Sequence, residues 1–158
     1  MSVALEDLSG KPKAGVKGPH AAAWLAAQGI QVPAQPNTWA GAIVARLAET
    51  EFFVEGEAAA KLESLRDPLP AGVYRVPRQD ACFMLSGTAL HDVLLQVCSI
   101  DFQGHHGDNA LFLTSMAGVS VLAIPMEQSI RIWADPTFGP YLWSTLSGIV
   151  QEIGGGTA

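Results

Sequence analysis

Residues 111–153 read LFLTSMAGVSVLAIPMEQSIRIWADPTFGPYLWSTLSGIVQEI, and this stretch decides the fold class. Its first part consists of short apolar, β-branched runs separated by turn residues, a pattern typical of strands. Three strands are predicted, over 111–115, 119–124 and 129–133. Because the first two are joined near Ala117-Gly118, they are expected to pair with each other.

A helix is predicted after the third strand. Asp135-Pro136 is a favourable helix start, and Gly154-Gly155-Gly156 ends the helix near residue 153. Between these limits apolar residues recur at intervals of three or four, as on one face of a helix: Leu142, Leu146, Ile149 and Ile153. Strands combined with packed helices in this way predict an α+β protein with mostly antiparallel sheet.

The preceding sequence predicts further elements of the same kind. Helices are expected at 19–28, 57–65 and 87–97, and strands at 42–47, 51–55, 73–76 and 81–85. Ser86 is expected to cap the helix that begins at Gly87. Residues 1–14 are polar and predict an extended N-terminal arm, and residues 15–155 predict a single unit of two lobes, about 15–70 and 71–155.

The two lobes are expected to be related to each other. Gly18 and Leu25 match Gly87 and Leu94 at an offset of 69 residues. An apolar strand also precedes a helix in both halves, at an offset near 78. Such self-similarity predicts two copies of one small α+β arrangement.

Charge is scarce and unevenly distributed along the 158 residues. The 9 basic and 15 acidic side chains make up 15% of the chain, against about 25% in an ordinary domain. After residue 78 the only basic residue is Arg131, so the net charge of −6 arises in the second half. Nucleic acid is excluded as a partner, since phosphate binding requires clustered Lys and Arg. Sparse charge instead favours a surface covered by another protein, either a different chain or a second copy of this one.

No targeting or membrane-spanning segment is expected. The N-terminus lacks a basic region followed by an apolar one, and the longest uncharged stretch, 109–126, is interrupted by polar residues. Cys82 and Cys98 are expected to be free thiols, and the cytoplasm is the expected location.

No residue pattern predicts an active site. The loop that holds Asp101, His105, His106 and Asp108 lacks zinc-like spacing and is expected to be solvated. Asp80 follows Arg78 closely and is expected to form an ion pair. Catalytic, cofactor-binding and metal-binding residues are therefore not assigned.

An aromatic cluster is expected near the start of the last helix, around Arg131 and Asp135. A pterin-like ring could stack on it, but core packing or contact with a partner is favoured. The candidate partner-interface residues are Arg131, Trp133, Phe138, Tyr141 and Trp143.

Five blocks of the sequence, in this order, resemble a known family. They are Gly15–Pro19 (GVKGP), Arg78–Ala81 (RQDA), Leu95–Phe102 (LQVCSIDF), Thr114–Val121 (TSMAGVSV) and Arg131–Trp143 (RIWADPTFGPYLW). Together they resemble the gamma subunit of heterotetrameric sarcosine oxidase, over about residues 8–153.

The resemblance implies a fold like the folate-binding domain of the glycine cleavage aminomethyltransferase. It implies a non-catalytic assembly subunit of a complex that oxidises sarcosine to glycine and passes the methyl carbon to tetrahydrofolate or releases it as formaldehyde. The partners would be alpha, beta and delta subunits. FAD, FMN, NAD and tetrahydrofolate would belong mainly to alpha and beta, and zinc to delta. A stand-alone folate-binding or aminomethyltransferase-like protein, or the small subunit of an N-methylglutamate dehydrogenase complex, stays open.

Overall fold

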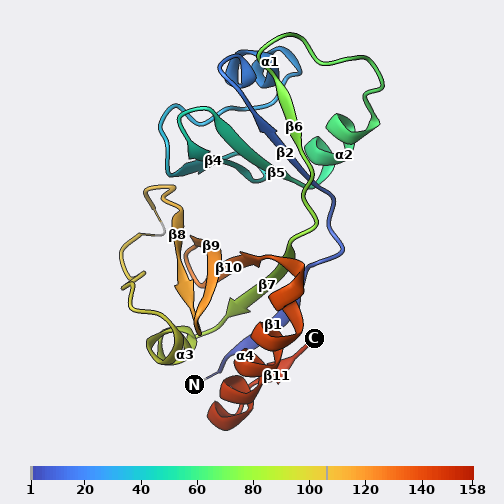
Figure 1. Ribbon diagram of the computed structural model, residues 1–158. Coiled ribbons are helices and arrows are strands. Elements are labelled where there is room, and N and C mark those ends of the chain that lie inside the picture. The colour runs from blue at the N-terminus through green and yellow to red at the C-terminus, as the bar shows by residue number, and fades with distance from the viewer. Residues whose placement is uncertain (1, 106) are drawn as a thin grey trace. The chain divides into compact units, whose positions relative to one another are not determined.

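The computed structural model describes residues 2–105 and 107–158 and divides into two compact units (Figure 1). The middle unit is Lys11–Arg78, and the terminal unit combines residues 2–10 with Gln79–Ala158. Each unit has one sheet and two α-helices, which confirms the α+β fold with mostly antiparallel sheet. None of the helices in the described chain has the length and apolar character needed to cross a membrane.

The middle unit is built on a five-stranded antiparallel sheet. In sheet order its strands are β3 (Thr38–Ala40), β4 (Val44–Ala48), β5 (Glu51–Glu55), β2 (Lys13–Lys17) and β6 (Tyr74–Val76). The helices are α1 (Ala21–Ala27) and α2 (Glu57–Ser64). Alternate strand residues such as Val16, Phe52 and Val54 pack with Leu25 of α1 and Leu62 of α2 to form its core.

The terminal unit is built on a six-stranded sheet. In sheet order its strands are β11 (Gly156–Thr157), β1 (Ala4–Asp7), β7 (Ala81–Ser86), β10 (Ser129–Ala134), β9 (Val119–Pro125) and β8 (Phe112–Met116). Its helices are α3 (Leu90–Val97), the short 3₁₀ helix η1 (Pro136–Phe138) and α4 (Gly139–Ile153). All neighbouring strands are antiparallel except β1 and β11.

The β8–β9 hairpin confirms the predicted turn at Ala117-Gly118. Met116 pairs with Val119, and the two residues between them have φ values of 51° and 81°. Positive φ at both central positions defines the type I′ turn, whose twist matches that of the strands.

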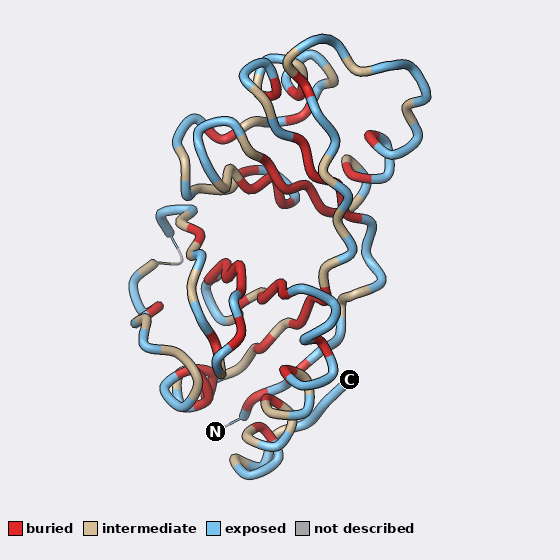
Figure 2. Tube along the Cα trace, in the orientation of Figure 1, coloured by how far each residue is buried: buried red, intermediate tan, exposed pale blue. Residues whose placement is uncertain are grey.

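The core of the terminal unit lies between this sheet and the helices α3 and α4. Ile130 and Ile132 of β10 belong to the same hydrophobic cluster as Leu142 and Leu146 of α4, and all four side chains are fully buried. Figure 2 shows this burial along the strands and along one side of the last helix. The predicted helical periodicity after residue 136 therefore identified residues that pack on the sheet.

The two sheets share one topology, which explains the predicted relationship between the halves of the chain. The middle unit has the order β3-β4-β5-β2-β6, and the terminal unit has β8-β9-β10-β7-β1 before its extra strand β11. Gly18 follows β2 and donates to the carbonyl of Thr50 at 2.9 Å. Gly87 follows β7 and donates to the carbonyl of Gln128 at 3.1 Å.

The first strand of each half completes the sheet of the other half. β1 precedes β2 in the chain but pairs with β7, whereas β6 precedes β7 but pairs with β2. The residues just before these strands accept equivalent bonds, because His20 donates to Gly72 at 3.1 Å and Ala89 donates to Ser2 at 2.8 Å. The boundaries between the units consequently lie at residues 10–11 and 78–79.

Because β1 pairs with β7, the N-terminal segment belongs to a sheet. Residues 1–14 were expected to form an arm, but Ala4–Asp7 form β1 and Lys13 begins β2. Val3 and Leu5 point into the core of the terminal unit. These two apolar residues alternate with exposed ones as in a strand, although most of the segment is polar. The expected division into two lobes near residue 70 also differs from the observed division. The reason is that β6 is in the same unit as β2, and β1 is in the same unit as β7.

The start of α3 also corrects the expected cap. α3 begins at Leu90 rather than Gly87, and no side chain caps it. Gly87 has a φ of 117°, which breaks the backbone away from helical geometry, so Ser86 ends β7 instead of capping a helix.

Candidate functional site

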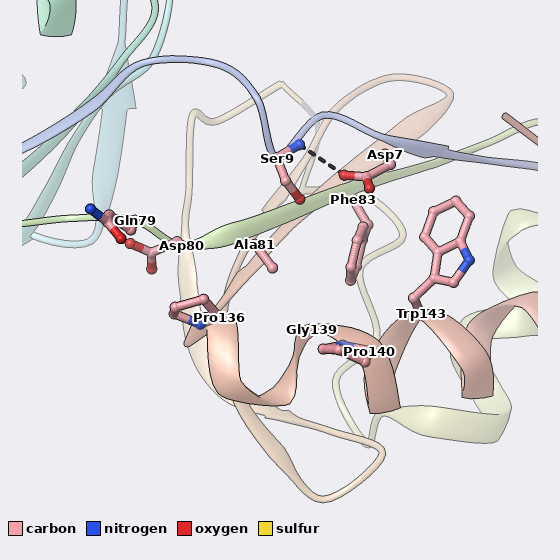
Figure 3. A pocket seen from close by; sticks show the side chains of 10 residues that line it. All are labelled: Asp7, Ser9, Gln79, Asp80, Ala81, Phe83, Pro136, Gly139, Pro140 and Trp143. Atoms are coloured by element: carbon pink, nitrogen blue, oxygen red, sulfur yellow. Dashed lines mark hydrogen bonds between the residues drawn. The ribbon is translucent and has the colours of Figure 1, made fainter.

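A pocket of about 410 Å³ lies in the terminal unit (Figure 3). Three segments form it: the end of β1 and the residues after it, the start of β7, and the first turns of the η1–α4 helix. Its lining consists of Asp7, Ser9, Gln79, Asp80, Ala81, Phe83, Pro136, Gly139, Pro140 and Trp143. This volume lies within the range of about 300–1,000 Å³ that is usual for ligand pockets.

Ser9 fixes the first segment against β7. Its hydroxyl oxygen accepts a hydrogen bond from the Cys82 backbone N–H at 3.0 Å, and its own backbone N–H donates to Oδ1 of Asp7 at 2.9 Å. Leu8 adds a backbone bond to the carbonyl of Cys82 at 2.8 Å. The carboxylate of Asp7 is thus held at the pocket by the exchanged strand β1.

An aromatic wall closes the helix side of the pocket. The Trp143 ring lies 5.2 Å from the ring of Phe83, tilted by 55°. Gly139 allows the helix to approach β7 closely, since a Cβ at this position would lie 3.1 Å from the Cβ of Ala81. Residues 136, 139, 140 and 143 are spaced so that they share one side of the helix, which is the side that faces the pocket.

The helix N-terminus at the pocket has little capacity left to bind an anion. The backbone N–H groups of Thr137, Phe138 and Gly139 already donate to Asp135 Oδ1, the Asp135 carbonyl and the Pro136 carbonyl. Pro136 and Pro140 have no N–H. Five residues at this helix start, 136–140, therefore offer no open amide to a phosphate or carboxylate.

Asp135 is the cap of this helix start. The Thr137 hydroxyl donates to Asp135 Oδ1 at 2.6 Å, and the Thr137 N–H donates at 2.9 Å. These two bonds, the hydroxyl bond being the stronger influence, hold the pKa of Asp135 below its ordinary value. The cap therefore stabilises the folded chain at neutral pH, and this contribution is lost as the pH falls through the lowered pKa.

Replacing Thr137 by Val is expected to raise the pKa of Asp135 towards its ordinary value, because the hydroxyl donor is removed while the backbone donor stays. Carboxyl-carbon NMR across an acid titration measures this pKa directly. Thr145→Val, a hydroxyl loss further along α4, serves as the control and should leave the Asp135 titration unchanged. An unchanged pKa in Thr137→Val would contradict the cap.

The five candidate interface residues do not form one cluster. Trp143 lines the pocket, while Phe138 and Tyr141 are 51% and 53% exposed on the η1–α4 helix. The Tyr141 hydroxyl donates to the carbonyl of Ala117 at 2.9 Å, which places its ring over the β8–β9 turn. Phe138 and Tyr141 are therefore available to a partner.

Trp133 is only 1% exposed, in contrast to Phe138 and Tyr141. It lies on β10 between Ile132 and Ala134, whose side chains point to the helices, so Trp133 and Arg131 point to the opposite face of the sheet. A helix and a strand present their aromatic residues in different directions. The aromatic residues expected to cluster are therefore divided between a strand, which carries Trp133, and the η1–α4 helix, which carries the other three.

In the polar loop before β8, the side chains of His105 and Asp108 contact each other. Nδ1 of His105 lies 3.0 Å from Oδ2 of Asp108, and this hydrogen bond is the main reason why the pKa of Asp108 is lowered. His106 lies outside the described residues. Among the residues that are described, no three His, Cys, Asp or Glu side chains come together as a possible metal site.

The remaining candidates are placed individually. Asp80 lines the pocket, and the guanidinium of Arg78 lies 4.8 Å from the ring centre of Phe53 in the middle unit. Cys82 is buried and Cys98 is half-buried, and the two do not form a disulfide. Asp7 and Ser9 were missed from the sequence because they fall in the segment that was taken for an arm.

Known proteins share this fold. No protein-family model and no curated protein sequence matches the chain. A chain of heterotetrameric sarcosine oxidase from Corynebacterium sp. U-96, in complex with pyrrole 2-carboxylate, matches with a TM-score of 0.73 and 23% identity, over 95% of this chain and 84% of that one. Glycine cleavage system aminomethyltransferase T from Bartonella henselae matches with a TM-score of 0.62 and 18% identity, over 92% of this chain and 45% of that one.

Proposed function

We propose that this chain is a non-catalytic assembly subunit of a flavin-dependent oxidase complex that acts on an N-methyl amino acid. The observation that carries this proposal is the extent of the structural match to a chain of heterotetrameric sarcosine oxidase, which covers nearly all of this chain and most of that one. A match of this extent supports the proposal that this chain is the counterpart of one whole subunit.

The charge distribution supports a role in assembly. The terminal unit holds nine carboxylates against the single basic residue Arg131, a formal charge of −8. The middle unit holds eight basic and six acidic residues, a formal charge of +2. A strongly acidic unit with exposed aromatic residues is suited to a basic partner surface, since charge complementarity steers association and aromatic side chains supply contact area.

In this proposal the redox chemistry belongs to the partner chains in the cytoplasm. FAD, FMN and NAD would be bound by the alpha and beta subunits and zinc by the delta subunit. The assembled complex would oxidise the N-methyl group of sarcosine or of N-methylglutamate, and comparing these two amines as substrates distinguishes the two kinds of complex.

The test is coexpression with candidate flavin-binding and NAD-binding chains from the same source, followed by size-exclusion chromatography. We expect this chain to elute with them in one peak. Elution by itself, as a monomer or a homodimer, would contradict the proposal.

Phe138→Ala is expected to weaken the complex about tenfold or more while the melting temperature of the isolated chain stays unchanged. The ring is half exposed and belongs to no described core cluster, and large aromatic residues at interfaces often contribute about 2 kcal/mol or more to binding. Titration of the tagged chain against its partners measures the affinity.

Leu95→Ala is the matched control for Phe138→Ala. Leu95 is 80% exposed on α3. Its replacement by Ala therefore removes a comparable apolar surface from the same unit without a change in α4. Equal losses of affinity in both variants would show that the η1–α4 surface is not the specific site at which the partners bind.

A second candidate is folate binding by the isolated chain, which the fold shared with aminomethyltransferase T favours. The described pocket fits folate poorly, because two carboxylates and no basic side chain line it, whereas the glutamate tail of folate is anionic. Calorimetry with tetrahydrofolate decides this candidate. Heat with a one-to-one stoichiometry would support it, and the absence of heat at high ligand concentration would exclude it.

A further inference from the structure

The outermost strand of the middle sheet, β6, corresponds to β1 of the terminal sheet (Figure 1). The carbonyls of Gly72 and Ser2 accept equivalent bonds just before these two strands. Three residues further along, Arg75 of β6 therefore corresponds to Leu5 of β1. On its outer side β1 pairs with the parallel strand β11, whereas in the described part of the chain no strand lies beyond β6. One of two equivalent edges is thus covered, and the other is open.

The covered edge shows which backbone groups such a strand presents outward. The N–H of Asp7 donates to the carbonyl of Ala158 at 3.0 Å, and the carbonyl of Leu5 accepts from the N–H of Ala158 at 2.8 Å. Backbone groups point the same way at every second residue of a strand, so the N–H of Leu5 points outward as well. Arg75, as the counterpart of Leu5, consequently presents both its N–H and its carbonyl at the open edge.

The segment that follows α2 is unsuited to cover this edge. β11 follows α4 almost directly, and the equivalent residues after α2 are 65–70, LRDPLP. Pro68 and Pro70 lack the N–H that pairing with a neighbouring strand requires. The carbonyl of Pro70 is also bonded within a turn, to the N–H of Val73 at 3.2 Å. A strand at the edge of β6 would therefore have to come from elsewhere.

We propose that an extended segment of a partner chain adds to β6 as a further, parallel strand of the middle sheet. The existence of the partner rests on the proposed function. Its backbone donates to the carbonyls of Val73 and Arg75 and accepts from the N–H of Arg75, in the same way as β11 pairs with β1. Pro77 stands where β1 has Asp7 and has no N–H, so the pairing ends there.

The side chains at the edge indicate what kind of segment fits. Tyr74 is 57% exposed, and Val76 is half-buried on the same face of β6. When a strand is added to a sheet, main-chain bonds supply affinity and the neighbouring side chains supply specificity. Aromatic residues pair favourably across strands with aromatic and β-branched ones. The partner segment is therefore expected to place such a residue beside Tyr74.

A second copy of this chain is a poorer occupant of the edge. Two β6 strands that pair antiparallel about Arg75 would bring two like charges directly opposite each other, which destabilises a strand pair. Pairing about Tyr74 would need the N–H of Val73, which already donates to Pro70 at 3.2 Å. Pairing further along would need the missing N–H of Pro77. A different chain meets none of these restrictions.

Arg75→Pro and Arg75→Ala separate the backbone N–H from the side chain. Both variants lose the guanidinium that donates to the carbonyls of Leu62 and Leu65, but only proline also removes the outward N–H. Proline is tolerated on an edge strand where the N–H faces outward. We expect Arg75→Pro to bind the coexpressed flavin-binding and NAD-binding chains about tenfold more weakly than Arg75→Ala, because a partner carbonyl loses its donor. Titration of the tagged variants measures both affinities.

Hydrogen exchange of the wild-type chain is a second measurement, which holds even if Arg75→Pro fails to fold. The Arg75 amide should exchange at least about tenfold more slowly in the complex than in the isolated chain. The amides of Tyr74 and Val76 point to β2 and serve as the internal control, because they should be protected in both states. Equal exchange of the Arg75 amide in both states, or equal affinity of the folded Pro and Ala variants, would overturn the proposal.

The same experiment separates this proposal from the proposed function. If the chain elutes with its partners while the Arg75 amide stays unprotected, the edge of β6 is not the contact and the assembly role stands. If the chain never elutes with partners, the assembly role is wrong, and so is a partner chain as the occupant of the edge. Protection of Arg75 that rises with the concentration of the isolated chain would assign the edge to a second copy and would likewise overturn the proposal.

Discussion

Deletion of residues 1–8 is expected to abolish cooperative folding of the terminal unit. This segment contains β1, which pairs with β7 over four residues and brings Val3 and Leu5 into the core. A graded version of the experiment is Leu5→Ala, since Leu5 is 1% exposed and truncation of a buried leucine costs about 2–5 kcal/mol. Urea unfolding and amide hydrogen exchange of β7 measure both effects.

Glu6→Ala is the matched control for Leu5→Ala, because Glu6 is the next residue of the same strand and is exposed. It should change the free energy of unfolding by less than about 0.5 kcal/mol. Full amide protection of residues 81–86 after the deletion would show that residues 1–8 are an arm after all.

Gly18→Ala and Gly87→Ala are each expected to destabilise the chain by about 3 kcal/mol, a sizeable part of the total stability of a domain. Both glycines have positive φ, 126° and 117°. A methyl group at Gly18 would overlap the carbonyl oxygen of Gly72, and one at Gly87 would lie 2.5 Å from the carbonyl oxygen of Ser2. These carbonyls precede the two exchanged strands, so each substitution should loosen the unit that contains it.

Gly148→Ala provides the opposite control within α4. This glycine lies in regular helix with no atom near the position of a Cβ, so the substitution should stabilise the chain by about 0.5–1 kcal/mol. Thermal and urea unfolding of the three variants compares them directly. A neutral Gly87→Ala would contradict the close approach of Ser2 to the turn after β7.

The elements with strong local patterns could be predicted from the sequence. Glu51–Glu55 forms the expected strand without any change in its bounds, and the Ala117-Gly118 turn joins the two strands that surround it. Leu142 and Leu146 face the sheet as the helical spacing predicts. In each case the information lies within a few neighbouring residues.

The exchanged strands could not be predicted in this way, because their partners lie far away in the chain. Leu5 pairs with Leu85, eighty residues later, and nothing local to Ala4–Asp7 identifies that neighbour. The alternation of Val3 and Leu5 was a usable signal for a half-buried strand, but it is only two residues long.

The site was harder to predict than the fold for the same reason. Trp133 and Trp143 occur in one aromatic-rich stretch, yet the first points away from the helices on a strand and the second lines a pocket from a helix. Asp7 and Asp80 belong to separate segments, and only the exchange of β1 brings them to one cavity. The division into structural units also changes the charge balance. The terminal unit has a formal charge of −8, whereas residues 79–158 alone have −6.

Native mass spectrometry of the complex purified through a tag on the flavin-binding chain tests the assembly role most directly. The expected result is one copy of this chain in each heterotetramer, and a smaller share of complexes that contain it when the Phe138→Ala variant is used. A catalytically competent complex that contains the other chains and no copy of this one would contradict the account.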